Sequence, residues 1–361
     1  MMSGLRSAMR ILCVVAIGGM GVGAVGGCRS APPPVPKQSQ ALVKRVQMHM
    51  GTLVTLTAVA PTDEAAQRAV AEGFRYVRYL EGLWSTWIPT SELSQINAMA
   101  GKGSVAVSES TATLIAASLE AARLTEGGFN IAMGPVVEAW GISKEPRVPS
   151  RSALEALRPL LDLSAVTLER APARIGVTKP GMRLDIGGIG KGYAADLTAQ
   201  VMRAQGATAG VVALAGDIVT FGTLPDNKRF PVGIQHPRHP GEVLATIELQ
   251  DEAISTAGDY ERAFEQDGHW YHHILDPRTL EPARLCQSVT IVAKDGLWAD
   301  GLDTGIFVMG PERGMVLIEA LPDVEGVIVD AEGRVLISSG LRERVKVTAG
   351  VETAPLAPAT R

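Results

Sequence analysis

Apolar positions along the chain predict a first half rich in helices and a second half rich in strands. Residues 43–59 alternate apolar and polar side chains in places, which predicts either a pair of strands or one long strand. Helices are predicted at 62–82, 91–97, 110–126 and 150–162. From Val166 onward, short apolar runs bounded by Gly, Pro, Asp and Asn predict strands at 166–168, 173–177, 211–215, 230–235, 243–249, 270–275, 288–293, 324–330 and 334–338.

The second half is not all strand, and nothing in it marks a domain boundary. Helices are predicted at 190–205, 297–308 and 311–320. No Pro- or Ser-rich linker divides residues 41–348, so we expect one large α+β domain with mixed or antiparallel sheets flanked by helices. An Ala-, Pro- and Thr-rich tail over 349–361 is expected to be flexible.

The N-terminus has the pattern of an export signal. Two arginines precede an apolar, Gly-rich run over 11–25 that is too short for a good membrane span. The run ends in Val25-Gly26-Gly27-Cys28, which resembles a bacterial lipobox. That resemblance implies a signal peptide over 1–27, cleavage before Cys28, lipidation of its thiol and a Pro-rich tether over 28–40. The domain would then be periplasmic or otherwise extracytoplasmic and lipid-anchored to a bacterial membrane; the alternative is an ordinary signal peptide with a bystander cysteine.

Composition excludes several classes of protein. Of 361 residues, 46% are hydrophobic and 20% charged, which is typical of a globular chain. The formal net charge of -4 argues against a nucleic-acid partner, because such proteins neutralise phosphates with excess Lys and Arg. The 3 cysteines are too few for a disulfide scaffold or a Cys-rich zinc site. Once the signal is removed and Cys28 is lipidated, Cys286 stands alone, and we expect it to fill apolar space.

A Gly-rich turn over 184–193 is the first segment with candidate chemistry. Its sequence is Leu-Asp-Ile-Gly-Gly-Ile-Gly-Lys-Gly-Tyr, so a strand ends, the backbone is left open, and a helix begins near Lys191. Backbone N–H groups at such a helix start favour anions, and the lysine adds charge, which predicts a phosphate cradle. It is not a P-loop, because Gly192 stands where that motif has Ser or Thr. The alternative is a tight structural turn with a surface lysine.

A second segment carries hard oxygen ligands. Asp300, Asp303 and Thr304 are spaced i, i+3, i+4 and share one face of a helix. Two carboxylates and a hydroxyl suit Mg²⁺ or Ca²⁺. The alternative is a solvated first turn of a helix, with acids favoured by its dipole, but apolar neighbours such as Trp298 and Phe307 argue against full solvation.

A third segment is polar over 255–262, where a turn is expected, and is followed by a strand that ends in the Pro turn of 272–279. Its histidines do not predict zinc, because His272 and His273 point to opposite faces of a strand and no HExxH or Cys partner exists. A serine hydrolase is excluded because the chain has no G-x-S-x-G elbow.

These segments, in this order, resemble the FAD:protein FMN transferase family, the ApbE-type flavin transferases. The similarity runs from about Met50 to Ile337. Its landmarks are Met50-Gly51-Thr52, Ser91 to Asn97, Gly134-Pro135 with Trp140-Gly141, Asp185 to Asp196, Gly216-Asp217, Ser255 to Arg262, His273 to Thr279 and Ala299 to Thr304.

The resemblance implies a T-fold-like, ApbE-type α+β fold that binds FAD, uses Mg²⁺ and transfers the FMN moiety to a threonine hydroxyl of a target protein, with AMP leaving. The implied metal ligands are Asp300, Asp303, Thr304 and the backbone carbonyl of Gly188. The positions implied to line the FAD site are Met50, Trp87, Phe129, Asn130, Ile131, Asp185, Lys191 and Ile274. Catalytic roles would fall to Lys191, Asp303 and His273, the last as general base, with an aspartate near the metal as the alternative base.

Three positions depart from the family pattern. Asn130 stands in place of Asp, and Ala215 in place of Gly. Leu280 replaces the Gly of a Thr-Gly-x-Pro turn, so we expect this turn to avoid a positive φ.

Two other functions remain open at this stage. One is Mg²⁺-dependent hydrolysis of FAD to FMN and AMP, and the other is a non-catalytic flavin-binding lipoprotein. For the leading function, the resemblance suggests an acceptor threonine in a membrane redox complex or in its maturation system.

Overall fold

The computed structural model of the chain describes residues 40–354. The predicted signal, the lipidation site Cys28 and nearly all of the Pro-rich tether lie outside the described residues, as do residues 355–361. Within the described part, no helix combines the length and the apolar character that crossing a membrane requires.

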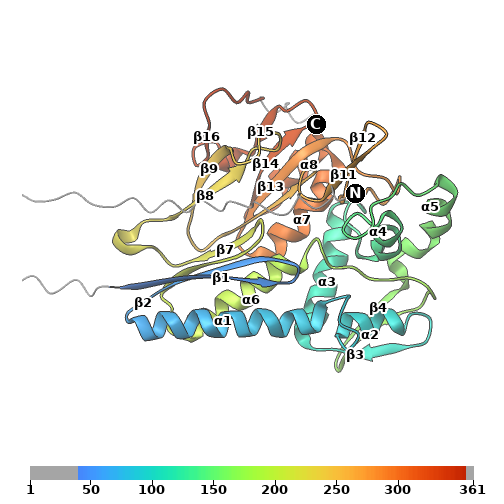
Figure 1. The fold of residues 1–361 in the computed structure, drawn as a ribbon, viewed down its shortest axis with the longest axis horizontal. Helices are drawn as coiled ribbons and strands as arrows, with labels where there is room; N and C mark the ends of the chain where they lie inside the picture. The colour runs from blue at the N-terminus through green and yellow to red at the C-terminus, as the bar shows by residue number, and fades with distance from the viewer. Residues whose placement is uncertain (1–39, 355–361) are drawn as a thin grey trace, which may run out of the picture.

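One eight-stranded sheet runs through the middle of the molecule (Figure 1). All pairings between its strands are antiparallel. In spatial order the strands are β1 (Ala41–His49), β2 (Thr52–Ala60), β6 (Ala209–Leu214), β7 (Asp217–Phe221), β10 (Ala253–Gly258), β13 (Cys286–Ala293), β14 (Val324–Asp330) and β15 (Val335–Ile337). The fold class expected from the sequence, a single α+β domain, is confirmed.

Helices cover one face of this sheet. The strands beneath them alternate, so that Val54, Leu56 and Ala58 of β2 point into the helical layer and are fully buried. The covering helices are α1 (Asp63–Trp84), α6 (Gly190–Ala204), α7 (Gly296–Met309) and α8 (Pro311–Ala320), and α3 (Glu109–Leu124) packs against α7. Three shorter helices, α2 (Glu92–Ala98), α4 (Gly134–Trp140) and α5 (Arg151–Leu157), lie beyond the end of the sheet (Figure 1).

Smaller sheets complete the domain. The sheet of β8 (Phe230–Gln235), β9 (Val243–Leu249) and β16 (Lys346–Val347) packs on the face of the main sheet opposite α1 and α6 (Figure 1). The others are β3 (Ser104–Ala106) with β5 (Ala173–Val177) and β4 (Val166–Arg170), and the hairpin of β11 (Ala263–Gln266) with β12 (His269–His272). The main sheet therefore separates two apolar cores.

Several helices begin where a short polar side chain caps them. The hydroxyl oxygens of Thr62, Ser91, Ser108 and Ser150 each accept a hydrogen bond from the N–H three residues later. Each cap satisfies one of the N–H groups that a helix start leaves unpaired. These local signals explain why the boundaries of α1, α2 and α3 lie within a few residues of those predicted from the sequence.

The sequence prediction was wrong for two central strands. Residues 253–258 form β10, although Ser255 to Gly258 looks polar and turn-forming, and β7 was not predicted at all. Tertiary contacts overrode the local pattern, since the Thr256 hydroxyl bonds that of Thr290 on β13. Glu352 and Ala354, near the end of the described chain, form backbone hydrogen bonds with Val335. Residues 43–59 form the pair β1 and β2, one of the two alternatives.

Leu280 corrects a further expectation, because it adopts φ of 64° in a turn where a leucine should avoid positive φ. Its side chain is fully buried in an apolar cluster with Trp140 and Leu154. Its carbonyl accepts a hydrogen bond of 2.8 Å from Trp140 Nε1, and its N–H donates to the carbonyl of Asp276 at 2.7 Å. Burial and these bonds offset the backbone strain.

The Leu280→Gly substitution measures that balance. It removes strain of about 1–3 kcal/mol but deletes a buried leucine side chain, which costs about 2–5 kcal/mol. We expect the free energy of unfolding, measured in urea, to fall by about 1–2 kcal/mol in net. A more stable variant would mean that the strain dominates.

Two glycines set the distance between α6 and α7. A Cβ on Gly192 would lie 2.0 Å from the carbonyl oxygen of Gly296, and one on Gly296 would lie 2.4 Å from the carbonyl oxygen of Gly192. Since both obstacles are backbone atoms, neither can turn aside. The two helices can therefore touch at this point only because both residues lack side chains.

We expect Gly192→Ala to push α6 and α7 apart and to lower the free energy of unfolding by at least about 1–3 kcal/mol. Gly82→Ala in α1 is the matched control, because nothing lies within 4 Å of its added Cβ. That variant should gain about 0.5–1 kcal/mol from higher helix propensity. Equal stabilities for the two variants in thermal unfolding would contradict this account of the contact.

Candidate functional site

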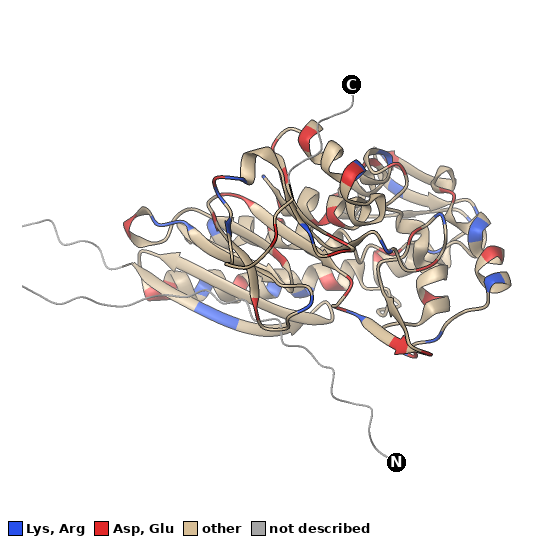
Figure 2. Cartoon of the chain, turned by 90° about the horizontal axis from the view of Figure 1, so that it is seen from above, with Lys and Arg blue, Asp and Glu red and all other residues tan. Residues whose placement is uncertain are grey.

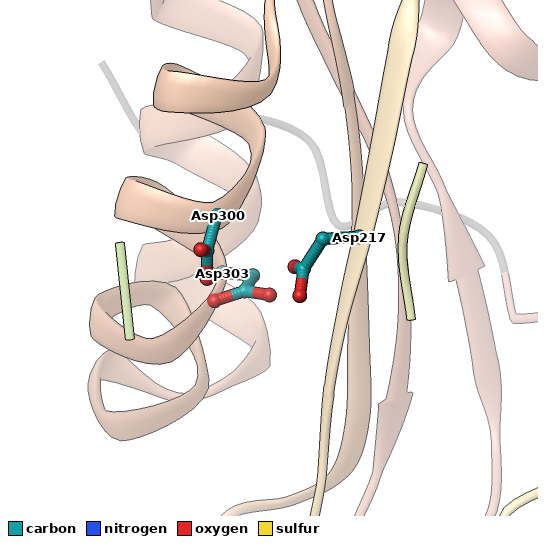
Figure 3. A group of neighbouring side chains, drawn as sticks. All are labelled: Asp217, Asp300 and Asp303. Carbon is teal, nitrogen blue, oxygen red and sulfur yellow. The ribbon is translucent and has the colours of Figure 1, made fainter. Parts of the chain in front are cut away.

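Three buried aspartates meet between α7 and the main sheet. Asp300 and Asp303 come from α7 and Asp217 from the start of β7, with their carboxylates pointing toward one another (Figure 3). One carboxylate oxygen from each lies within 4.8 Å of the others. The three residues are only 2–3% exposed. The sequence predicted that Asp300 and Asp303 share a face, and the sheet adds the third carboxylate.

Local structure explains the place of Asp217. The hairpin from β6 to β7 turns on Ala215 and Gly216, and the pairing of Leu214 with Asp217 closes it. Ala215 takes φ of 57°, a conformation that glycine adopts without strain and that the family pattern supplies with Gly. The tight turn places Asp217 at the very end of the sheet, facing α7.

Lys191 is the cation of this cluster. It lies in the first turn of α6, its ammonium group bonds Asp217 Oδ2, and it lies 3.7 Å from Asp300 Oδ1. Burial lowers the pKa of Lys191, but the nearby aspartates outweigh burial and raise it in net. The lysine is therefore charged at neutral pH and fixed by carboxylates, which contradicts the alternative of a free surface lysine.

The cluster holds more carboxyl groups than cationic groups. Three carboxylates face one ammonium group, and burial is the largest cause of the raised carboxyl pKa values. Burial, with the charge of Asp217, raises the pKa of Asp300 to about 7. Burial, with the charges of Asp300 and Asp217, raises the pKa of Asp303. Protons or a cation are needed to balance this site.

Two further observations fit a divalent cation at this cluster. The Ser255 hydroxyl lies within hydrogen-bonding distance of both Asp217 Oδ1 and Asp303 Oδ2, yet its one proton serves only one of them at a time. Asp303 Oδ1 is buried with no hydrogen-bond partner. An acceptor left unpaired inside a protein is costly, so these oxygens fit the donor set of a hard divalent cation.

The other implied ligands lie at the same place. A Cβ on Gly188 would lie 3.2 Å from Thr304 Oγ1, so the Gly-rich turn touches the ligand face of α7. The N–H of Gly192 donates a hydrogen bond of 2.8 Å to Asp300 Oδ2. The structure thus brings Gly188 to Asp300, Asp303 and Thr304, which lie more than 100 residues further along the chain.

A cavity of about 740 Å³ opens onto this cluster. Its lining includes Phe129, Asn130, Asp185, Lys191 and Ile274, five of the eight positions implied for FAD. Asn130 is committed to structure as well, because its Oδ1 caps the N–H of Ala132 and its Nδ2 bonds the carbonyl of Leu161. The cavity is large, concave and mixed in polarity, as small-molecule sites are.

The structure does not bring the other three implied positions, Met50, Ile131 and Trp87, into the lining. Ile131 points into the apolar core and is fully buried, and Met50 forms the strained turn between β1 and β2 with φ of 51°. Trp87 is 67% exposed, and Lys144 Nζ lies 3.6 Å over its ring. Lys144 follows Ser143, which lines the cavity, so Trp87 stands beside the mouth rather than inside.

His273 faces the same cavity. Burial is the main cause that lowers its pKa to about 3, helped by the charge of Arg262. Its backbone N–H donates to the carbonyl of Arg262 at 3.0 Å, while its Nδ1 is buried without a partner. The ring is therefore neutral at physiological pH and has one nitrogen available.

Sequence reasoning missed Asp217 and Ser255 as parts of the site. The available signal was an aspartate that directly opens the apolar run Ile218 to Phe221, since a carboxylate is unfavourable there without a partner.

Elsewhere Lys and Arg are spread among Asp and Glu along the chain (Figure 2), and pairs such as Arg123 with Glu120 are exposed. Exposed pairs contribute little, which sets the buried cluster apart.

Comparison with known proteins finds curated relatives that are flavin transferases. The chain is 32% identical to the FAD:protein FMN transferase of Treponema pallidum over 320 residues, covering 84% of this chain and 88% of that one. It is 36% identical to a FAD:protein FMN transferase of Vibrio cholerae over 241 residues, covering 65% and 72%.

Solved structures share the fold as well. The crystal structure of the ApbE protein from Thermotoga maritima superimposes with a TM-score of 0.78 at 30% identity, covering 84% of this chain and 99% of that one. The flavin transferase ApbE from Vibrio cholerae gives a TM-score of 0.75 at 29% identity, covering 84% and 99%. Residues 50–328 match the sequence profile of the ApbE family. Because the family profile covers most of the chain and the relatives and folds match over the same range, the chain belongs to the ApbE family.

Proposed function

We propose that this protein transfers the FMN moiety of FAD to a threonine hydroxyl of a target protein and releases AMP. The observation that carries the proposal is the buried cluster of three aspartates and Lys191 at the floor of a cavity of about 740 Å³. The names of the relatives support the same activity. The acceptor would belong to a membrane redox complex or to its maturation system.

A Mg²⁺ ion fits the acidic cluster, because Asp303 Oδ1 lacks a partner and the carboxylates exceed the cations. Asp300, Asp303 and Thr304 would hold it with the carbonyl of Gly188, and Asp217 lies close enough to join them. When bound, Mg²⁺ supplies charge that neutralises a pyrophosphate and polarises its phosphorus.

The chain's own groups would perform the remaining work. Lys191, held by Asp217, would place its positive charge near the pyrophosphate, while the N–H of Gly192 at the start of α6 holds Asp300 in place. The threonine oxygen would bond to the FMN-side phosphorus as the bond from that phosphorus to the AMP oxygen breaks. His273 would accept the threonine proton at Nδ1, and since burial disfavours its charged form, it would pass that proton on to AMP.

Incubation of the enzyme with FAD, Mg²⁺ and a peptide that carries the family's acceptor threonine motif should give a covalently flavinylated peptide and AMP. Asp303→Asn should lower the transfer rate by about 10²-fold or more, because it removes an anionic ligand from the cluster. Asp63→Asn, at an exposed position in the first turn of α1, is the matched control and should keep the wild-type rate. Mass spectrometry of the peptide gives the readout.

The same assay separates the two alternatives. Free FMN formed at a rate that the peptide does not change would indicate a Mg²⁺-dependent FAD pyrophosphatase. Tight FAD binding that survives Asp303→Asn, with no turnover in Mg²⁺, would indicate a non-catalytic flavin-binding lipoprotein. Either result would replace the proposed transferase.

Export and lipid anchoring are proposed on the sequence pattern around Cys28. The full chain expressed in a Gram-negative host should be found in the membrane fraction, because an acylated N-terminus partitions into lipid. The Cys28→Ser protein should either leave the membrane fraction or keep its uncleaved signal peptide. Immunoblots of the fractions would show which. Unchanged, processed and membrane-bound protein in that variant would contradict lipidation at this residue.

A further inference from the structure

The cavity extends well beyond the acidic cluster, toward the side of the main sheet that the helices do not cover. This extension is lined by Thr55 and Thr57 of β2, Val211 and Ala213 of β6, and residues of β8. None of these residues is among the positions that the family resemblance implies for FAD. The extension therefore offers space for a second substrate.

One wall of this extension continues onto an exposed apolar row. Lys44 pairs with Thr57, and Val46 pairs with Thr55, so these side chains share the face that lines the cavity. Alternation puts Leu42 and Met48 on that same face. Leu42, Val46 and Met48 are 40%, 52% and 55% exposed. These three large apolar side chains lie on one face of β1, the edge strand of the main sheet. Such a row is unusual on a surface that stays in water.

The opposite wall is the edge strand β8, which pairs only with β9 in its sheet. Pro231 has no N–H with which to form a hydrogen bond to β9. It must therefore stand at a position whose backbone N and C=O point away from β9. Gly233, two residues on, shares this orientation. A second observation agrees: Thr348 N–H donates to the carbonyl of Leu244, so Thr246, two residues along β9 and opposite Gly233, also points away from β8.

Gly233 therefore presents its N–H and C=O outward, beside the cavity, and it has no side chain to keep another backbone away. The end of β8 nearest the catalytic residues is fixed in place. Just beyond it, the Arg238 guanidinium donates two hydrogen bonds, of 2.6 and 2.7 Å, to the carboxylate of Asp259, which follows β10. Tyr260 and Glu261 then continue the cavity lining toward the cluster.

We propose that this extension, the β8 groove, binds the acceptor protein as an extended segment that adds to the edge of β8 at Gly233. The groove is defined by Thr55, Thr57, Val211, Ala213, Pro231 and Gly233, together with the apolar row Leu42, Val46 and Met48. The segment would place alternate apolar side chains on that row and lead its threonine toward Lys191 and Asp217. The inference rests on the proposed flavin transfer and names the site of its protein substrate.

Gly233→Pro tests the backbone contact. Proline removes the outward N–H without removing a hydrogen bond to β9, and the space is open, since the nearest atom to an added Cβ is Val243 Cγ2 at 3.4 Å. With the acceptor-motif peptide as probe, we expect at least a tenfold rise in KM for the peptide. Val46→Lys should raise that KM in the same way by placing a charge on the apolar row.

Val316→Lys is the matched control, because Val316 is 64% exposed on α8, away from the groove, and it should keep the wild-type KM. The Kd for FAD, measured by flavin fluorescence, shows whether the acceptor or FAD occupies the groove. An unchanged Kd with a raised peptide KM supports the groove as the acceptor site. A Kd that rises in parallel would show that FAD itself occupies the groove, and the proposal would be wrong.

Two other outcomes distinguish the two levels of inference. If the wild-type enzyme transfers FMN and both groove variants do so with unchanged KM, the docking site is wrong but the transferase stands. If the wild type binds FAD but transfers nothing, the proposed function fails, and the docking role fails with it.

Discussion

The structure depends on the contact between the ammonium group of Lys191 and the buried carboxylates around it. A lone carboxylate would not remain ionised at a site this poor in water, and three would repel one another. Lys191 compensates one charge and leaves two, so the protein keeps a region that calls for a further cation. The same excess that makes the site costly for the fold makes it suitable for a metal ion and a pyrophosphate. Stability and function are therefore opposed at this point, as is common at catalytic centres.

The two helices that carry the cluster cap each other. The start of α6 is capped by Asp300 of α7, through the N–H of Gly192. The start of α7 receives Asp196 of α6, whose carboxylate accepts hydrogen bonds of 2.7 and 2.8 Å from the N–H groups of Gly296 and Leu297. Burial raises the pKa of Asp196 to about 7, although the two N–H groups lower it. Glycines at the crossing allow this approach, so the position of the metal ligands is set by backbone contact rather than by flexible side chains.

The layered architecture divides the work between the two faces of the main sheet. The helical face supplies Lys191, Asp300, Asp303 and Thr304, while the strand Asp217–Phe221 supplies the opposing carboxylate. The opposite face is covered only in part, by the sheet of β8, β9 and β16, so the cavity continues along it. Helices that cover one face and a smaller sheet that covers part of the other leave a cavity whose charged centre lies where the two faces meet.

The sequence by itself determined the fold class, the capped helices and the pairing of Asp300, Asp303 and Thr304 on one helix face. Those features depend on spacing and on neighbouring residues, which a sequence displays directly. Only the tertiary structure decided that Asp217 and Ser255 complete the cluster, that residues 253–258 are a buried strand and that Leu280 accepts a positive φ. The physical reason is the same in each case. A polar strand, a buried carboxylate or a strained turn is stabilised by partners that are distant in the chain, and no local pattern reports them.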